Sequence, residues 1–178
     1  HLKELLSSSD KKTLVSLMHA NNEIGTMIDI DEVGALCEEY GALFHSDTVQ
    51  TMGHFPMNLA ETKVLFITGA AHKFHGPKGV GVLYINRNVH VDSLIKGGSQ
   101  ERNLRAGTEN VYGIVGMAKA LEIALEDVNG HRQHIQSIKD YMCKILREEI
   151  LGTEINGSLE RSLYTDLNER LPKSDKEE

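Results

Sequence analysis

The stretch Val64-Leu-Phe-Ile-Thr-Gly-Ala-Ala-His-Lys-Phe-His-Gly-Pro-Lys-Gly-Val-Gly-Val-Leu-Tyr-Ile85 sets a basic, glycine-rich segment between two apolar runs. We expect strands over residues 64–68 and 79–85, because both runs are rich in β-branched and aromatic residues and are bounded by glycine or proline. The segment between them, residues 68–81, therefore begins where a strand ends. Ligands of α/β proteins bind at such strand ends, so this stretch predicts both a sheet and a binding site at its edge.

Toward the N-terminus, strands and helices alternate. The expected elements are a short polar helix over residues 2–8, a strand over 13–19, a helix over 29–39 and a strand over 42–47. The first strand is apolar enough to be buried on both faces, as in a parallel sheet covered by helices. Asp29 or Asp31 would cap the second helix, and Gly41 would end it. This alternation favours the α/β class, with a mainly parallel sheet flanked by helices.

Toward the C-terminus, the pattern changes to a loop and two long helices. Residues 97–108 form a polar, glycine-punctuated loop of a length that is often functional. A largely buried helix is expected over 111–125. An amphipathic helix is expected over 131–150, with Ile135, Ile138, Met142, Ile145 and Leu146 on its apolar face. Asn129-Gly130 between the helices indicates a domain boundary, and residues 172–178 are expected to be a disordered tail.

Composition restricts the class of protein. The 178 residues include 19 Lys and Arg against 26 Asp and Glu, a formal net charge of -7, which argues against a nucleic-acid partner. No run approaches the roughly 18 apolar residues of a membrane-spanning helix, so no membrane partner is expected. The two cysteines, Cys37 and Cys143, lack metal-ligand spacing and indicate neither a disulfide framework nor a zinc site. We therefore expect a reducing, cytoplasmic setting.

Three interpretations of the basic segment compete. In the first, it is a turn before a strand, with exposed basic residues. In the second, His72 and His75 bind a metal together with His45 and Asp47, although the interposed lysine and the following proline make a poor zinc site. In the third, Lys73 is a Schiff-base lysine, since a partly desolvated lysine can lose its proton and attack a cofactor aldehyde.

The third interpretation requires further groups in particular roles. Pyridoxal phosphate needs a carboxylate at its ring nitrogen, which keeps the ring an electron acceptor, and Asp47 stands at the end of its own strand. The ring oxygen and the phosphate need hydrogen-bond donors. The candidate donors are Asn22, Gln50, His72 and Thr108.

Four motifs, in order and spacing, resemble the cysteine desulfurases of the NifS/IscS type, with selenocysteine lyase as close kin. They are Met18-His-Ala-Asn-Asn-Glu-Ile-Gly25, His45-Ser-Asp-Thr-Val-Gln50, Ala71-His-Lys-Phe-His-Gly-Pro-Lys-Gly79 and the loop 97–108. The resemblance covers nearly all of residues 1–160. It implies the fold-type I pyridoxal phosphate class, with residues 1–128 as part of the large cofactor-binding domain and 129–171 as the start of a small α+β domain.

The resemblance also implies a role for each site residue. Lys73 would hold the cofactor covalently, Asp47 would pair with its ring nitrogen, and Asn22 and Gln50 would contact its ring oxygen. His72 would bind the phosphate, and Thr108 would reach the phosphate of the partner subunit in a homodimer. One departure falls inside the site, because Ala70 stands where the family usually has a phosphate-binding serine. The Ala70 backbone N–H can still bind an anion, and Thr68 is a candidate substitute for the hydroxyl.

The implied activity is conversion of L-cysteine to L-alanine, with the sulfur passed to an enzyme cysteine and then to an acceptor such as an iron-sulfur scaffold protein. The family's reactive cysteine loop has no counterpart here, and Cys37 and Cys143 are expected to be structural thiols. The chain also opens on His1 rather than Met. We therefore expect an inactive fragment of a longer enzyme. The alternatives are a selenocysteine lyase or another class V aminotransferase relative, and a cofactor-free folding or interaction module.

Overall fold

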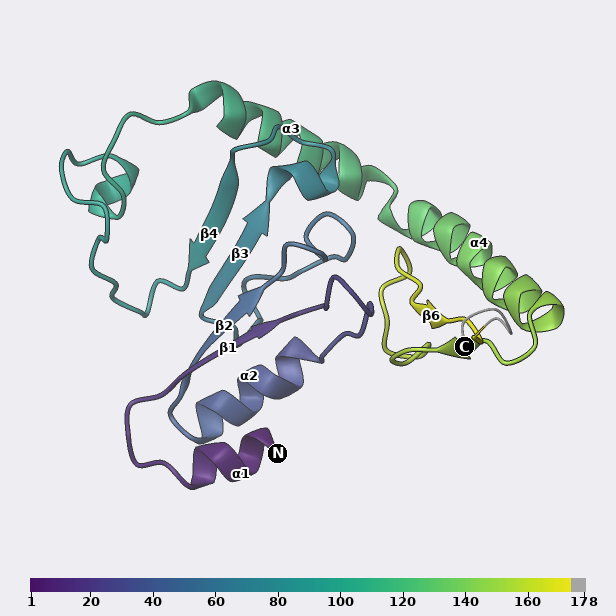
Figure 1. The fold of residues 1–178 in the computed structure, drawn as a ribbon. Helices are drawn as coiled ribbons and strands as arrows, with labels where there is room; N and C mark the ends of the chain where they lie inside the picture. The colour runs from purple at the N-terminus through teal and green to yellow at the C-terminus, as the bar shows by residue number, and fades with distance from the viewer. Residues whose placement is uncertain (174–178) are drawn as a thin grey trace.

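A four-stranded sheet forms the centre of the computed structural model, which describes residues 1–173. Its strands are β1 (Leu14–Met18), β2 (Leu43–Asp47), β3 (Phe66–Ala70) and β4 (Gly81–Ile85), in that spatial order. β1, β2 and β3 run parallel, and β4 runs antiparallel to β3 (Figure 1). A parallel crossover needs about a dozen residues or more, and residues 71–80 are too few. The predicted α/β class with a mainly parallel sheet is confirmed.

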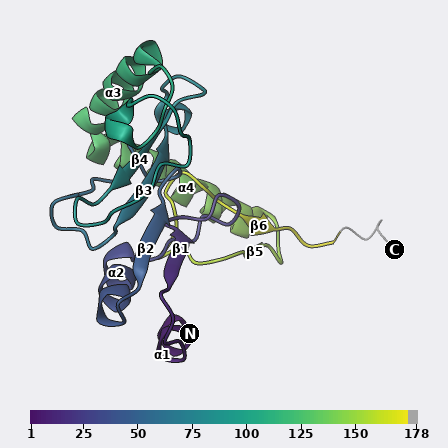
Figure 2. The same ribbon diagram turned by 90° about the vertical axis from the view of Figure 1, so that its left-hand side faces the viewer.

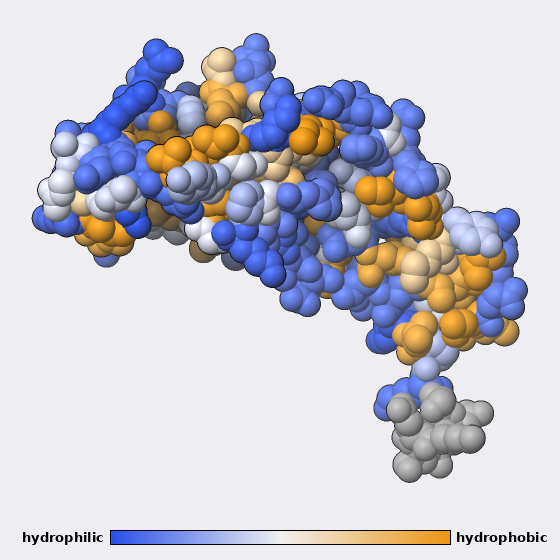
Figure 3. Space-filling model, turned by 90° about the horizontal axis from the view of Figure 1, so that it is seen from above, coloured by the Kyte–Doolittle hydropathy of each residue, from blue (hydrophilic) through white to orange (hydrophobic). Residues whose placement is uncertain are grey.

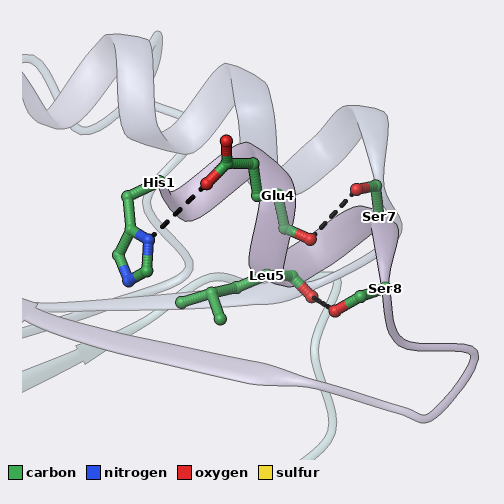
Figure 4. Close-up of polar contacts among 5 residues, drawn as sticks. All are labelled: His1, Glu4, Leu5, Ser7 and Ser8. Atoms are coloured by element: carbon green, nitrogen blue, oxygen red, sulfur yellow. Dashed lines mark hydrogen bonds and ion pairs between the residues drawn. The ribbon is translucent and has the colours of Figure 1, made fainter.

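Two helices cover one face of this sheet. α1 (Leu2–Ser7) and α2 (Ile30–Glu39) lie on the same side of it (Figure 1). The core between the helices and the strands consists of Leu6, Val15, Cys37, Ala42, Phe44, Val64 and Ile67. At the end of α1, the hydroxyls of Ser7 and Ser8 donate to the carbonyls of Glu4 and Leu5, at 3.0 and 2.9 Å (Figure 4). The Ser8 hydroxyl satisfies a carbonyl at the helix end, whereas the Glu4 carbonyl also accepts from the Ser8 backbone N–H at 3.2 Å.

The other face of the sheet is uncovered within residues 1–173. Val15 of β1 is 8% exposed, whereas its neighbour Leu14 is 58% exposed. Leu83 of β4, on the same face as Leu14, is 54% exposed. The prediction that the first strand is buried on both faces is therefore wrong for this chain, because α1 and α2 pack against one face alone.

α3 (Val111–Glu126) follows the loop that contains η2 (Glu101–Asn103), and it is less buried than predicted. It packs against the segment after β3 through small residues, since a Cβ on Gly116 would lie 2.7 Å from Pro77. Its larger residues Val115 and Ile123 are more than half exposed. Apolar side chains accordingly gather on the surface over α3 and α4 (Figure 3). The prediction of a largely buried helix is wrong, because this contact is made by the small-residue face.

α4 (Val128–Glu149) begins before the break predicted at Asn129-Gly130. Asp127 caps it, and its carboxylate accepts from the Gly130 N–H at 3.1 Å, so the glycine lies inside the helix. The buried face of α4 also differs from the prediction. Lys139 and Cys143 are buried, whereas the predicted Ile138 and Met142 are half exposed. The turn between the helices therefore falls at Asp127.

After α4 the chain returns toward the sheet. β5 (Glu154–Ile155) and β6 (Glu169–Arg170) form a small antiparallel pair, and residues 161–168 run between α4 and the loop after β1 (Figures 1 and 2). Met27 N donates to Arg161 O at 2.8 Å, and Leu163 N donates to Gly25 O at 2.8 Å. Of the tail predicted over 172–178, residues 174–178 lie outside the described residues. In the described part of the chain, no helix is long and apolar enough to cross a membrane.

Candidate active site

The carboxyl ends of the parallel strands meet at one edge of the sheet (Figure 1). The strand register aligns Met18 with Asp47 and Asp47 with Thr68. Beyond these positions the chain continues into the loop 19–27, the turn 47–50 and the short helix η1 (Ala71–Phe74). The structure thus brings the loop containing Asn22, the turn containing Asp47 and Gln50, and the segment containing Ala70, His72 and Lys73 to the same edge.

Asp47 ends β2 and is half-buried. Its Oδ1 accepts from the Val49 N–H at 2.9 Å, which leaves the second carboxylate oxygen for another donor. The turn that follows is tied to β3, because the Thr48 hydroxyl and N–H both donate to the Thr68 carbonyl, at 2.8 and 2.9 Å. Thr48 is fully buried. The carboxylate therefore stands on a rigid turn at the strand end.

His72 and Lys73 lie on η1, directly after β3 and Ala70. Both are exposed, and within residues 1–173 neither side chain has a hydrogen-bond partner. η1 ends at His75, whose φ of 66° is left-handed, and Gly76 N then donates to Ala71 O at 2.8 Å. This tight turn leads the chain back into β4. It presents a free amine and an imidazole at the edge that also holds Asp47.

Asn22 lies on a loop that Asn21 organises. Asn21 Oδ1 accepts from the N–H groups of Glu23 and Ile24 at 2.9 and 3.0 Å, and Asn22 Nδ2 donates to Glu23 Oε1 at 2.9 Å. Asn22 is exposed and its amide oxygen remains available. Gln50 is half-buried at the end of the Asp47 turn. Both amides thus lie on segments that follow strands at this edge.

Thr108 is not brought to this edge by the elements around it. The segment between β4 and α3 leaves the sheet on the side away from the arrowheads of β2 and β3 (Figure 1). Thr108 is exposed near the end of that segment.

Several polar contacts beside the edge were not predicted. His45 bridges Ser16 and Thr68 across the uncovered face, with Nδ1 2.8 Å from Ser16 Oγ and Nε2 3.3 Å from Thr68 Oγ1. His19 is buried with Nδ1 2.9 Å from Thr51 Oγ1, and burial lowers its pKa from 6.5. Because its hydroxyl contacts His45, Thr68, the predicted substitute for the missing serine, already has a side-chain partner.

His54 makes the contact that sequence patterns had no means of showing. One ring nitrogen lies 3.0 Å from the hydroxyl of Tyr164, and the other lies 3.2 Å from the carbonyl of Lys73. Tyr164 is 110 positions away in the chain. No periodicity or local motif links residues at that separation.

The two thiols do not have the properties of a reactive cysteine. Cys37 is 1% exposed in the core, Cys143 is 6% exposed on α4, and burial raises the pKa of both. A buried thiol with a raised pKa is a poor nucleophile, which agrees with the predicted structural role. Among the residues that the structure describes, no group of three or more His, Cys, Asp or Glu side chains is placed to hold a metal ion.

The donor set at the edge suits pyridoxal phosphate. The three segments that follow β1, β2 and β3 carry a lysine amine, a carboxylate, an imidazole and two amides. Among the residues that the structure describes, the amine and one oxygen of the carboxylate have no partner. The amine, carboxylate, imidazole and amides are the groups that the cofactor's aldehyde, ring nitrogen, phosphate and ring oxygen require. Ala70 contributes no hydroxyl to the set.

The site and the sheet define an α/β protein with a lysine at the carboxyl edge of its strands. Comparison with known proteins shows the family to which it belongs. The chain belongs to the family described as Aminotransferase class-V, which it matches over residues 1–167. It is 45% identical over 155 residues to "Cysteine desulfurase IscS" of Dictyoglomus turgidum, covering 87% of this chain and 39% of that protein.

Solved structures agree with this assignment. A structure titled "NIFS-LIKE PROTEIN" is 41% identical with a TM-score of 0.88, covering 96% of this chain and 47% of that one. A NifS-like protein from Rickettsia africae is 34% identical with a TM-score of 0.89, covering 98% of this chain and 49% of that one. The chain thus spans about two fifths of the Dictyoglomus relative and just under half of these two solved structures.

Proposed function

We propose that this chain is the cofactor-binding part of a pyridoxal phosphate-dependent cysteine desulfurase. The observation that carries the proposal is the placement of Lys73 and Asp47 at one edge of the sheet, in a chain of the class V aminotransferase family. The relatives' names support sulfur rather than selenium as the element transferred. L-cysteine would be the substrate, and L-alanine the product.

Each edge residue would have one task. Asp47, through its free oxygen, would hold a proton at the ring nitrogen. His72 and the Ala70 backbone would bind the phosphate, and Asn22 and Gln50 would contact the ring oxygen. Lys73 would hold the cofactor covalently and, once released as a free amine, would take the proton from the substrate Cα. When bound, the cofactor supplies an electron-accepting ring that stabilises negative charge at that carbon.

The sulfur step needs a thiolate that neither Cys37 nor Cys143 supplies, because both are buried. We propose that a cysteine outside this chain attacks the substrate sulfur and passes it to an acceptor such as an iron-sulfur scaffold protein. Thr108 would act on the partner's phosphate in a homodimer, which is consistent with its place away from the edge. The turn at Asp127 is the proposed start of the small domain.

The test is covalent capture of the cofactor by this chain. Mixing with pyridoxal phosphate, followed by borohydride reduction and peptide mass spectrometry, should place one adduct on Lys73. Lys73→Ala should abolish the adduct, whereas Lys78→Ala, at an exposed lysine of the same segment, should preserve it. No adduct at any cofactor concentration, as the cofactor-free module would give, or one spread over several lysines contradicts the proposed site.

A further inference from the structure

His54 joins the turn that carries Lys73 to a distant part of the chain. It is half-buried, and both nitrogens of its ring are engaged, one with the Lys73 carbonyl at 3.2 Å and one with the Tyr164 hydroxyl at 3.0 Å. Tyr164 is 3% exposed, and its ring packs against His54 and Phe55, with centroids 5.9 and 5.6 Å away. The contact between His54 and Tyr164 is therefore partly shielded from water.

The partners determine which ring nitrogen of His54 carries the proton. A backbone carbonyl only accepts hydrogen bonds, so Nε2 must donate to Lys73 O. In the neutral imidazole Nδ1 is then an acceptor, and the Tyr164 hydroxyl must donate to it. The bonds run in one direction, from Tyr164 O–H to Nδ1 and from Nε2–H to the carbonyl. The carbonyl thereby selects the tautomer, and the Tyr164 hydroxyl anchors the ring through the remaining nitrogen.

The Lys73 carbonyl depends on this external donor. It belongs to η1, a four-residue helix whose end carbonyls have few partners inside the helix. The next residues leave the helix through the left-handed His75. The position of the Lys73 backbone, and hence of the side chain that it carries, is therefore set in part by His54.

Tyr164 is itself held in place by the segment 161–168. The buried Lys139 donates to Ser162 Oγ and Leu163 O at 2.7 and 2.6 Å, and Leu163 N donates to Gly25 O. Arg132 of α4 lies 5.2 Å from the ring centroid of Phe55, beside Tyr164. The same segment thus contacts the loop of Asn22 and, through His54, the turn of Lys73.

We propose that His54 is a positioning residue for Lys73, and that the Tyr164 hydroxyl anchors its ring through Nδ1, so that residues 161–168 hold the lysine in place. This inference rests on the proposed function, because it assigns a role to a residue that acts through the cofactor lysine. It does not require that His54 touch cofactor or substrate.

The test combines a spectroscopic readout with a kinetic one. In wild type with the ring neutral, 15N NMR of the imidazole should show the Nε2–H tautomer with a hydrogen-bonded Nδ1, and Tyr164→Phe should shift the Nδ1 resonance to that of an acceptor without this bond. The rate at which borohydride traps cofactor on Lys73 should fall about two- to tenfold in Tyr164→Phe, the range expected for one hydrogen bond. Tyr112→Phe, at a tyrosine that is 92% exposed on α3, is the matched control and should change neither.

Two His54 variants separate positioning from packing. Gln retains an N–H that can reach the Lys73 carbonyl, so His54→Gln should trap cofactor at close to the wild-type rate. His54→Leu fills similar space without a donor and should be slowed, with faster amide hydrogen exchange over residues 71–76. Equal rates and equal exchange in His54→Leu and wild type overturn the proposal, as does an unchanged Nδ1 resonance in Tyr164→Phe.

Failure of the proposed function is distinguishable from failure of this inference. If wild type never traps cofactor on Lys73, the proposed function fails, and the tautomer and exchange measurements, which need no cofactor, still decide whether His54 holds the turn. If wild type traps cofactor and the His54 and Tyr164 variants match it in every readout, the inference alone fails.

Discussion

At the scale of single residues, Lys139 shows how one buried cation secures a distant segment. It is 7% exposed, and its ammonium has two acceptors, Ser162 Oγ and Leu163 O. Burial lowers the pKa of Lys139 from 10.5, against the opposing effect of nearby groups that include Asp166 and Asp140. From the sequence, Lys139 is expected to be an exposed charged residue of a helix. In the structure, it holds residues 161–168 in place.

Replacing Lys139 with Met should lower the free energy of unfolding by about 1–3 kcal/mol, because the buried Leu163 carbonyl loses its donor while the aliphatic stem is kept. Urea unfolding followed by circular dichroism measures the change. Lys144→Met is the control, since Lys144 is an exposed helix lysine paired only with Glu148, and it should cost less than about 1 kcal/mol. Equal effects of the two substitutions would contradict the role given to Lys139.

Wild type and Lys139→Met also allow a test of how stability depends on pH. Between its lowered folded pKa and 10.5, Lys139 binds more protons in the unfolded chain than in the folded one, so stability should rise with pH across that window. The stability difference between wild type and Lys139→Met should therefore grow as pH rises toward 10.5. A difference that stays constant over this window would show that the lysine titrates alike in both states.

At the scale of elements, α2 illustrates a prediction that local chemistry carries well. Asp29 was predicted as one of two N-cap candidates, and its Oδ1 accepts from Asp31 N and Glu32 N at 3.0 and 2.9 Å. Gly41, the predicted end, has a left-handed φ of 65°. These signals act within a few residues of one another, so sequence alone was enough.

Asp29→Ala should lower the free energy of unfolding by about 0.5–2 kcal/mol, because two N–H groups of the first turn lose their acceptor. Asp29→Asn retains an acceptor oxygen and should cost much less. Thermal unfolding by circular dichroism compares the three proteins. An alanine variant as stable as wild type would mean that water satisfies the first turn equally well.

Strand boundaries and burial were predicted less well. The strand expected over 64–68 is β3 at Phe66–Ala70, two residues later, because pairing with β2 and β4 selects those residues. Apolar composition predicted burial for β1 and α3, yet each has exposed apolar residues. Composition shows which side chains can be buried, but which ones are buried depends on what packs against them.

At the scale of the whole molecule, residues 161–168 link parts that sequence keeps far apart. Asn168 Nδ2 donates to Glu23 O at 2.9 Å, across 145 positions. Gly25 is buried on the same loop with φ 68°, and a Cβ there would lie 3.1 Å from Asp166 Cβ. The loop that carries Asn22 is thus shaped in part by the C-terminal segment.

Gly25→Ala should destabilise the chain more than Gly41→Ala. Both glycines are left-handed, so each alanine should cost about 1–2 kcal/mol of conformational strain. Gly41 has nothing within 4 Å of its Cβ position, whereas at Gly25 the alanine also presses on Asp166. Urea unfolding should rank wild type, Gly41→Ala and Gly25→Ala in falling stability. Equal losses would mean that the segment 161–168 moves aside without cost.

The sequence by itself determined the α/β class and the order of strands and helices, and it predicted the lysine, carboxylate and amides of the candidate site. Those features are written in local patterns and in motifs at strand ends. Only the tertiary structure decided which apolar faces are covered, which residues of α4 are buried, and that His54 connects Lys73 to Tyr164. The physical reason is that these features depend on contacts between residues that are distant in the chain, 110 positions for His54 and Tyr164, and they form only when the chain is folded.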